Sequence, residues 1–334
     1  MHINEESDDM KALGLLSGGL DSTLSTKLIL EQGIDVVAIN FTSPFCLCDR
    51  SGCGAVGVAK KFNIPLKIVQ KGKDYLRIIR NPKHGYGKNM NPCIDCRIYT
   101  LKKAKKYAKE IGASFIFTGE VLDERPMSQH MRALKIIEKE TGLEGRILRP
   151  LSAKLLPETE AEKKGWVDRK KLLDIRGRCR KRQIQLAKGW KINDYPCPSG
   201  GCLLTYKEFA DKIRDFIINE RILRIKDIPL LKIGRHFRLG KNKIIVGRDD
   251  NENKQLLKLK NASDYYFEVP GCGSPITLLQ GPKTKEMIEK TAALTTRYSD
   301  SKEKKTKVRF GRKKLNKSVI VSALSDEEIK RFRI

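Results

Sequence analysis

The sequence predicts an α/β protein with a parallel, doubly wound sheet, followed by a smaller α+β domain. Three features support this fold class. Short apolar runs alternate with helical patterns early in the chain, a glycine-rich loop follows the first apolar run, and the later part changes to short strands joined by turns. Strands that alternate with helices form βαβ units, and such units build parallel sheets.

The strands of the first domain are expected at residues 11–17, 35–41, 65–69, 114–118 and 146–151. Residues 11–17 have the pattern of a short buried strand, and residues 35–41 form the continuous apolar run that is typical of a parallel sheet. Helices are expected between them at residues 20–32, 56–62 and 97–111. Ligands of such sheets bind at the carboxyl ends of the strands, so the loops after Leu16, Phe41 and Thr118 should line a site.

The later part of the chain has a different pattern. Helices are expected at residues 166–190, 207–220 and 282–298, and a last strand at residues 318–323. A hairpin is expected in HFRLGKNKIIVGRD, because a Gly-Lys-Asn turn separates two apolar pieces. We therefore divide the chain into residues 1–155, residues 156–225 and residues 226–334. The middle part is a basic helical extension that returns Cys202 to the first domain.

The chain is strongly basic. Its 334 residues include 68 Lys and Arg against 40 Asp and Glu, a formal net charge of +28. Contacts of Lys and Arg with phosphates release counterions, so this excess favours a nucleic-acid partner. The densest part, residues 169–191, contains ten cations and one acidic residue. The candidate RNA contacts within it are Arg178, Arg180, Lys181 and Arg182.

Two features bear on location. No apolar run approaches the roughly 20 residues that a membrane-spanning helix needs. The N-terminal residues are polar and acidic, unlike a signal peptide. We therefore expect a cytoplasmic protein that has no membrane partner.

The loop SGGLDS lies between the first expected strand and the first expected helix. Gly18 and Gly19 allow a tight turn and a close approach of the backbone to a ligand, and Ser17 and Ser22 offer hydroxyl donors. The helix N-terminus behind them favours an anion. The Lys-Ser/Thr pair of a Walker A loop is missing. Asp21 is suited to hold Mg²⁺ beside phosphates.

Nine cysteines are present, an odd number that argues against a disulfide framework in a chain without an export signal. Cys93 and Cys96 form a CxxC pair at the start of a helix, where thiolates are favoured. Cys202 follows two glycines in PSGGC, five residues after Cys197. A further group, after the second strand, consists of Cys46, Cys48 and Cys53. No role is assigned to the remaining two, Cys179 and Cys272.

Several stretches resemble the pyrophosphate-loop (PP-loop) ATPases, which cleave ATP between the α and β phosphates and adenylate an oxygen. SGGLDS matches their phosphate loop. The stretches that look like the nucleotide-site segment of 4-thiouridine synthetases are Gly119-Glu120, Met127-Ser128-Gln129 and Arg149-Pro150-Leu151. NPCIDC is similar to the segment of tRNA 2-thiouridylases that carries their first catalytic cysteine, with Cys96 in its place. Cys93 stands where those enzymes usually have Asp.

The resemblance implies a fold like that of the adenine nucleotide alpha hydrolases, with ATP and Mg²⁺ as cofactors and tRNA as substrate. It implies Asp21, Cys96 and Cys202 as catalytic residues. The residues it implies for nucleotide binding are Ser17, Gly18, Gly19, Asp21, Ser22, Phe41, Gly119 and Gln129. The implied reaction is an ATP-dependent sulfurtransferase reaction, in which sulfur replaces a uracil oxygen to give 2-thiouridine or 4-thiouridine.

Three hypotheses are open for the chemistry of the cysteines. Thiolase relatives with CxxC and a distant Cys carry a [4Fe–4S] cluster, which implies Cys93, Cys96 and Cys202 (or Cys197 in its place) as iron ligands. In a cluster-free scheme, Cys202 carries a persulfide and Cys96 resolves it by disulfide formation. The third hypothesis is a structural Zn²⁺ site or spectator thiols. A separate Zn²⁺ site at Cys46, Cys48 and Cys53, completed by His84 or another Cys, is also open.

The C-terminal domain resembles the RNA-binding domain of fibronectin-binding-like ribosome quality-control proteins. The matching residues are Arg235-His236-Phe237-Arg238, Val246-Gly247-Arg248-Asp249, Asn251, Asn253 and Tyr298-Ser299. The sequence does not indicate whether the sulfur donor is free sulfide or a sulfur-carrier protein. It also does not indicate whether uracil O2 or O4 is replaced. Two alternatives remain: a tRNA-modifying enzyme with a nitrogen nucleophile, as in lysidine synthetases, and a non-catalytic RNA- or ribosome-binding protein.

Overall fold

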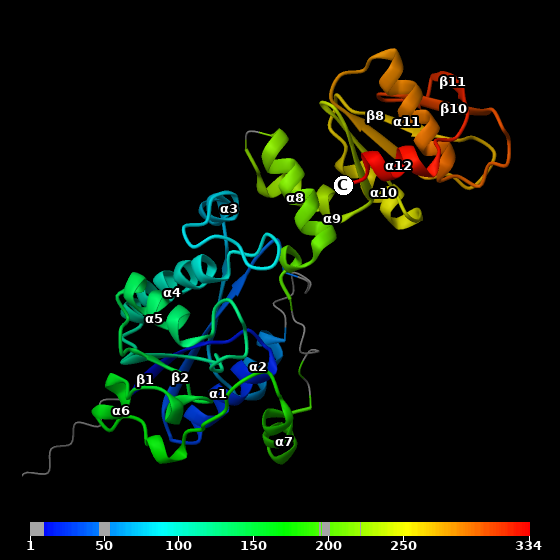
Figure 1. Ribbon diagram of the computed structural model, residues 1–334. Coiled ribbons are helices and arrows are strands. Elements are labelled where there is room, and N and C mark those ends of the chain that lie inside the picture. The colour runs from blue at the N-terminus through cyan, green and yellow to red at the C-terminus, as the bar shows by residue number, and fades with distance from the viewer. Residues whose placement is uncertain (1–9, 47–53, 194, 196–200, 221) are drawn as a thin grey trace, which may run out of the picture. The chain divides into compact units, whose positions relative to one another are not determined.

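The computed structural model describes residues 10–46, 54–193, 195, 201–220 and 222–334. The chain forms two compact units, Met1–Thr205 and Tyr206–Ile334 (Figure 1). The expected helix near residue 207 therefore belongs to the second unit, and the division lies about 20 residues before the boundary that the sequence indicated at residue 225. Among the described residues, no helix is both long enough and apolar enough to cross a bilayer.

The first unit is built on a parallel sheet. Its strands are β1 (Lys11–Leu15), β2 (Asp35–Thr42), β3 (Leu66–Gln70), β4 (Phe115–Thr118) and β5 (Ile147–Leu148). They lie in the order β3-β2-β1-β4-β5, and every neighbouring pair is parallel. This confirms the predicted α/β class. Because the order reverses beside β1, the loop after β1 lies at the switch point where such sheets bind ligands.

Helices cover both faces of this sheet (Figure 1). They are α1 (Leu20–Leu30), α2 (Ala55–Lys61), α3 (Lys73–Arg80), α4 (Cys93–Glu110) and α5 (Met131–Thr141). On one face, Leu13 and Ile39 of the sheet pack with Leu101 of α4. On the other face, Val36 packs with Ile29 of α1. Alternate residues of β1 and β2 thus point to opposite cores, which explains why these two strands are continuous apolar runs. The edge strand β3 (LKIVQ) is more polar and is not buried.

The prediction of one helix over residues 166–190 is wrong, because the helix found there is much shorter. Only α7 (Lys181–Gly189) and a short 3₁₀ turn, Arg169–Lys171, are helical there. Gly177 lies between them with a φ of +82°, a left-handed conformation that ends a helix and that glycine adopts without steric cost. The short helix α6 (Glu160–Lys163) precedes this region.

The second unit contains an antiparallel sheet. Its strands are β6 (Arg235–Leu239), β7 (Asn242–Val246), β8 (Tyr265–Glu268), β9 (Thr277–Gln280), β10 (Thr306–Gly311) and β11 (Lys317–Val321), in the order β11-β10-β8-β9-β7-β6. Its helices are α8 (Lys207–Asn219), α9 (Ile228–Lys232), α10 (Asp250–Leu259), α11 (Lys285–Arg297) and α12 (Asp326–Phe332). The β6–β7 hairpin and the strand near residue 318 confirm the expected α+β pattern.

Candidate active site at the phosphate loop and the cysteine cavity

The loop between β1 and α1 is held in a tight turn by its own side chains. The Ser17 and Ser22 hydroxyls lie 3.0 Å apart, and the Gly19 N–H donates to Ser17 Oγ at 3.3 Å. Gly18 has a φ of +78°, and a Cβ there would lie 2.2 Å from the Ala55 backbone nitrogen. The turn therefore requires glycine at this position, for both conformation and space.

Gly119, at the end of β4, packs directly against the same turn. A Cβ at Gly119 would lie 2.5 Å from the Cα of Ser22. The sheet edge after β4 is thus in contact with the first turn of α1. Two of the glycines predicted to serve the nucleotide site have this structural reason for being glycine.

Asp21 lies in the first turn of α1 and is paired with a distant arginine. Arg180 Nη2 lies 2.8 Å from Asp21 Oδ2 and 2.7 Å from a Glu124 carboxylate oxygen. Burial and the nearby Glu124 charge raise the pKa of Asp21 to about 6, against the opposing effect of Arg180. Asp21 Oδ1 is buried and makes no hydrogen bond to the described residues. This oxygen is free to accept a further ligand.

The four predicted RNA contacts have different surroundings. Arg180 is directed to Asp21 and Glu124, and its side chain is 15% exposed. Arg178 and Lys181 are exposed, and the exposed Arg182 is paired with Asp174 at 2.6 Å. In these ion pairs, the Arg180 guanidinium contacts the first turn of α1 behind the SGGLDS loop and does not point to solvent. Nothing in the local sequence distinguishes Arg180, because it is one of ten cations in residues 169–191.

The carboxyl ends of β1 and β2, the start of α4 and the segment at Cys202 line a cavity of about 310 Å³. We call it the cysteine cavity. Four cysteines line it: Cys46, Cys93, Cys96 and Cys202. Ser17 of the phosphate loop and Phe41 lie in the same lining. Phosphate loop and thiols therefore share one space, as the sheet-edge argument predicts.

Backbone pairing brings Cys202 to this cavity from more than 100 residues away. Cys46 and Cys202 form an isolated antiparallel bridge, and the Leu203 N–H donates to the Phe45 carbonyl at 2.8 Å. The Met90 N–H donates to the Leu204 carbonyl at 3.1 Å. By contrast, Cys179 and Cys272 are exposed and do not line the cavity. Cys48, Cys53 and Cys197 lie outside the described residues.

The thiolate form of Cys96 is stabilised by a nearby cation. Lys71 Nζ donates to Cys96 Sγ at 2.9 Å, and the Tyr75 hydroxyl donates to it at 3.3 Å. Burial opposes the thiolate, but the Lys71 charge and these hydrogen bonds outweigh it and hold the pKa of Cys96 below its ordinary value. Lys71 is itself only 8% exposed and lies 4.7 Å from the centre of the Tyr75 ring.

Cys93 and Cys202 have the opposite tendency. Burial raises the pKa of the Cys93 thiol, although the Asn91 amide donates to its sulfur at 3.2 Å. Burial raises the pKa of Cys202 to about 12. Of these three thiols, Cys96 is therefore the one that ionises first. Lys71 and Tyr75 were missed in the sequence, although Lys71 follows directly after β3 at the ligand-binding edge and could have been noticed there.

The cysteine cavity differs from a site for a single metal ion. Among the described residues, no group of three or more His, Cys, Asp or Glu is arranged to hold one ion. A four-iron cluster binds each cysteine through a different iron, so its ligands need not meet at one point. Three thiols around one cavity therefore fit a cluster by donor type. The expected Zn²⁺ site falls largely on Cys48 and Cys53, outside the described residues, and His84 is bound to Glu140 at 2.8 Å.

Comparison with known proteins gives matches for both units. Residues 8–154 match the family model described as Thiamine biosynthesis protein (ThiI). Residues 234–333 match the model described as NFACT protein RNA binding domain. The chain joins a ThiI-like PP-loop domain to an NFACT-type RNA-binding domain. This confirms the resemblances drawn from SGGLDS and from the RHFR and VGRD segments.

Among curated relatives, the tRNA-specific 2-thiouridylase MnmA of Coxiella burnetii is 27% identical over 143 residues, which are 40% of this chain and 39% of that protein. The match thus spans well under half of the relative. A solved 4-thiouridine synthetase in complex with RNA and ATP is 22% identical, with a TM-score of 0.35, over 68% of this chain and 53% of that one. The U34-tRNA thiolase NcsA of Methanococcus maripaludis with its [4Fe–4S] cluster is 21% identical, with a TM-score of 0.34, over 63% of this chain and 67% of that one.

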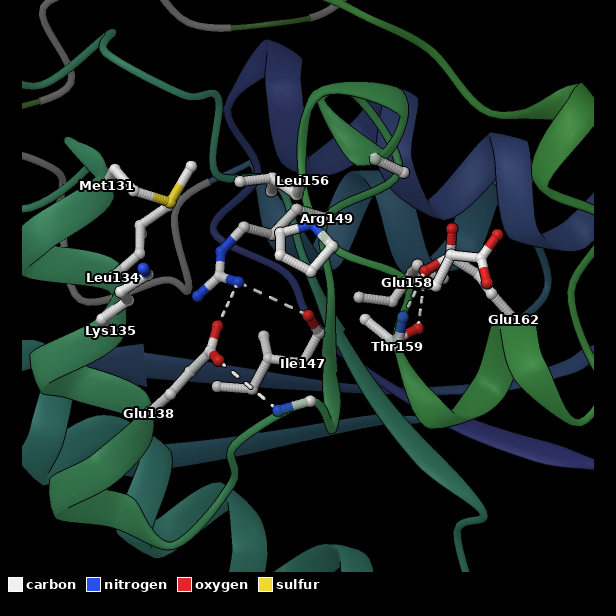
Figure 2. A pocket seen from close by; sticks show the side chains of 14 residues that line it. Met131, Leu134, Lys135, Glu138, Ile147, Arg149, Leu156, Glu158, Thr159 and Glu162 are labelled. Atoms are coloured by element: carbon white, nitrogen blue, oxygen red, sulfur yellow. Dashed lines mark hydrogen bonds and ion pairs between the residues drawn. The ribbon is translucent and has the colours of Figure 1, made fainter.

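In the PP-loop domain, a chain of buried ion pairs extends away from the cysteine cavity. Arg97, which lines that cavity, pairs with the fully buried Glu120 at 2.8 Å, and Glu120 also pairs with Arg149 at 3.1 Å. Figure 2 shows Arg149 directed toward Glu138 and the Ile147 carbonyl, beside a separate cavity of about 120 Å³. Burial opposes ionisation of Glu120, yet the two arginines hold its pKa below the ordinary value.

Gln129 has a mainly structural position. Its side-chain oxygen accepts from the Arg125 N–H at 3.0 Å, and the residue is only 3% exposed. The neighbouring Ser128 lines the cysteine cavity, whereas Gln129 does not. The predicted contact of Gln129 with a nucleotide stays a proposal, and its amide fixes the turn that presents Arg125.

Proposed function

We propose that the protein is an ATP-dependent tRNA sulfurtransferase that adenylates a uracil carbonyl oxygen and replaces it with sulfur. The observation that carries this proposal is the shared cavity: Ser17 of the phosphate loop and the thiols of Cys93, Cys96 and Cys202 line one space. Activation of an oxygen and delivery of sulfur need the same reacting carbon, so both sets of groups must reach it. The match to the PP-loop family and the RNA-binding domain supports the same proposal.

ATP would bind with its phosphates at the turn between β1 and α1. The turn places backbone N–H groups and the N-terminus of α1 beside each other, an arrangement that favours phosphate. Asp21 would hold Mg²⁺ through Oδ1, the oxygen left without a hydrogen bond. Arg180, which neutralises the other oxygen of Asp21, would then be within reach of the phosphates.

The uracil carbonyl oxygen would attack the α-phosphorus of ATP, with pyrophosphate as the leaving group. The product carries AMP on the former carbonyl oxygen. This converts an oxygen that leaves poorly into one that leaves well. A sulfur nucleophile then adds to the ring carbon, and AMP departs with the oxygen.

Cys96 is the residue best suited to sulfur chemistry, because Lys71 and Tyr75 stabilise its thiolate. In the cluster-free scheme, the terminal sulfur of a Cys202 persulfide attacks the ring carbon. The Cys96 thiolate then attacks Cys202 Sγ, which releases the sulfur to uracil and leaves a Cys96–Cys202 disulfide for an external thiol to reduce. A [4Fe–4S] cluster held by Cys93, Cys96 and Cys202 would instead supply an iron with an open position for sulfide.

We infer that tRNA is the partner, bound in part by the C-terminal domain and by the exposed cations Arg178 and Lys181. Sulfide would be the donor in the cluster scheme. The persulfide scheme would need a sulfur-carrier protein that transfers sulfane sulfur to Cys202, because sulfide alone does not have the oxidation state of persulfide sulfur. We place the reaction in the cytoplasm. A nitrogen nucleophile would make no use of the thiols in the cavity, and a non-catalytic RNA-binding protein would make no use of the glycine-dependent loop.

The proposal is tested by mass spectrometry of tRNA nucleosides from cells that lack the protein. We expect one thiouridine to disappear and to return on expression of the wild-type chain. Expression of Asp21→Ala or Cys96→Ser should not restore it, whereas Cys272→Ser, with its exposed thiol, should. An unchanged set of thiolated nucleosides in the deletion would contradict the proposal.

A further inference from the structure

The second unit contains a cavity of about 570 Å³, formed by α8, the start of β6, Arg248 in the loop after β7 and the C-terminal end of α12 with the residues that follow it. Six of its lining residues are Lys or Arg, and two, Glu208 and Asp211, are acidic. We call it the basic cavity. The net charge of its lining is therefore positive, and few carboxylates lie near enough to balance it.

Those carboxylates are already engaged or lie at the surface. Asp211 is bound by Lys207 at 2.7 Å and also by Arg214. Glu208 is exposed. Nearby Glu252, just outside the lining, accepts from the backbone N–H groups of Gly234 and Arg248 and pairs with Arg248 Nε at 3.4 Å. Within the described residues, Lys212, Arg235 and Arg333 form no ion pair, so these cations keep an excess of positive charge.

Lys212 is the clearest case. Its side chain is buried, with 8% of the residue exposed, and Nζ donates to the Gly234 carbonyl at 2.9 Å. No carboxylate of the described residues forms an ion pair with it. Burial, with the nearby Arg248 charge, lowers the pKa of Lys212 to about 8, although Glu208 and Glu252 act in the opposite sense. A buried ammonium without a counter-charge is unfavourable, so the arrangement fits an anion that is brought by a ligand.

Arg235 and Arg333 complete a set of donors. The Arg235 guanidinium lies 4.8 Å from the centre of the Tyr298 ring, and one of its nitrogens donates to the Gly247 carbonyl at 3.3 Å. These contacts fix the plane of the guanidinium, and its other N–H groups make no hydrogen bond to the described part of the chain. Arg333 is exposed at the rim. Guanidinium groups held in this way bind phosphate oxygens in pairs.

We propose that the basic cavity binds a backbone phosphate of RNA through Lys212, Arg235 and Arg333. The inference rests on the proposed RNA substrate and deepens it by placing one contact. Lys212 lies on α8, before the segment 234–333 that matches the RNA-binding domain. The phosphate site therefore extends that domain with a helix that the match does not include.

The test uses the full chain, without ATP, and a fluorescently labelled tRNA whose binding is followed by anisotropy at several salt concentrations. Lys212→Met and Arg333→Gln should each weaken binding several-fold and lower the salt slope by about one, because each removes one phosphate donor. Glu208→Gln should tighten binding, because it removes a carboxylate from the cavity wall. Lys304→Met removes one exposed cation of the same unit and is the control, for which a smaller change is expected.

Arg333→Gln covers the possibility that Lys212→Met disturbs folding, since Arg333 is exposed. Wild-type affinity and slope in both variants would overturn the proposal. A separate titration with inorganic phosphate distinguishes a free ion from RNA: if phosphate stabilises the wild-type chain and not Lys212→Met, while tRNA affinity is equal in both, the cavity binds free phosphate and the RNA assignment is wrong. Because no ATP or sulfur is present, failure here leaves the thiolation proposal standing.

Discussion

Single side chains in this protein are tuned by partners that lie far away in the sequence. Lys71 and Tyr75 act on Cys96, and Arg180 acts on Asp21. The sequence did not indicate Lys71 or Tyr75, and it indicated Arg180 only as a candidate RNA contact. The chemistry of both halves of the site thus depends on contacts that only the fold creates.

The Cys96 thiolate gives the first prediction. In iron-free protein, Lys71→Met should raise the pH at which Cys96 reacts with iodoacetamide, because the nearby positive charge is lost. At a pH below the pKa of Cys96, a pKa increase of one unit would slow alkylation about tenfold. Peptide mapping by mass spectrometry measures the rate at Cys96 alone. Lys67→Met is the control, because Lys67 lies against Tyr107 and not against Cys96. Equal Cys96 rates in wild type and Lys71→Met would show that Lys71 does not support the thiolate.

Asp21 gives a prediction about stability. Its folded pKa of about 6 lies above the ordinary value of 3.8, so the folded chain binds more protons than the unfolded chain between these pH values. In buffer without metal or nucleotide, this group should therefore lower the free energy of unfolding as the pH rises from about 4 to 6. The loss is up to about 3 kcal/mol, at 1.36 kcal/mol per pKa unit. Asp21→Asn should remove this part of the pH dependence in urea titrations. A variant with the wild-type pH profile would contradict the assignment.

The elements of the fold show what a sequence pattern can and cannot predict. The parallel strands and α4 were predictable, because apolar runs buried on both faces and a CxxC helix start are local signals. The break at Gly177 was missed. A run of Lys and Arg is compatible with a helix, and the sequence does not reveal that one glycine within the run has a positive φ. Strand β10 was missed within a polar stretch, although Val308 and Phe310 alternate with Lys307 and Arg309.

The residues of the candidate site, like the elements of the fold, could be predicted only in part from the sequence. The loop residues and the cysteines that line the cavity lie at strand ends, where topology alone brings them together. Lys71, Tyr75 and the inward turn of Arg180 depend on side-chain packing across segments that are far apart. Such contacts carry no local pattern and needed the three-dimensional structure.

The turn between β1 and α1 gives a prediction at the level of elements. Gly18→Ala should destabilise the PP-loop domain by roughly 1–3 kcal/mol and abolish nucleotide binding, because the residue has a positive φ and no space for a Cβ. Gly57→Ala is the matched control: Gly57 lies within α2 with nothing near its Cβ position, so this change should stabilise slightly. Thermal unfolding and nucleotide titration measure both effects. Normal nucleotide binding by Gly18→Ala would contradict the role of this turn.

At the scale of the whole molecule, the chain joins two units with separate tasks. The first unit holds the phosphate loop and the cysteine cavity, and the second has its own sheet, core and basic cavity. The net charge of +28 is consistent with an RNA that contacts more than one part of the chain. A change in the basic cavity should therefore alter RNA affinity, whereas a change at Asp21 should alter turnover with little effect on RNA affinity.

In the proposed reaction, ATP activates the oxygen that sulfur replaces. This step is tested with tRNA whose uracil carbonyl oxygens are labelled with ¹⁸O, incubated anaerobically with purified protein, ATP, Mg²⁺ and either sulfide or a persulfide donor. We expect one ¹⁸O to appear in AMP for each thiouridine formed, and Asp21→Ala to form neither product. Thiouridine accompanied by unlabelled AMP, or formed without ATP cleavage, would rule out this activation step.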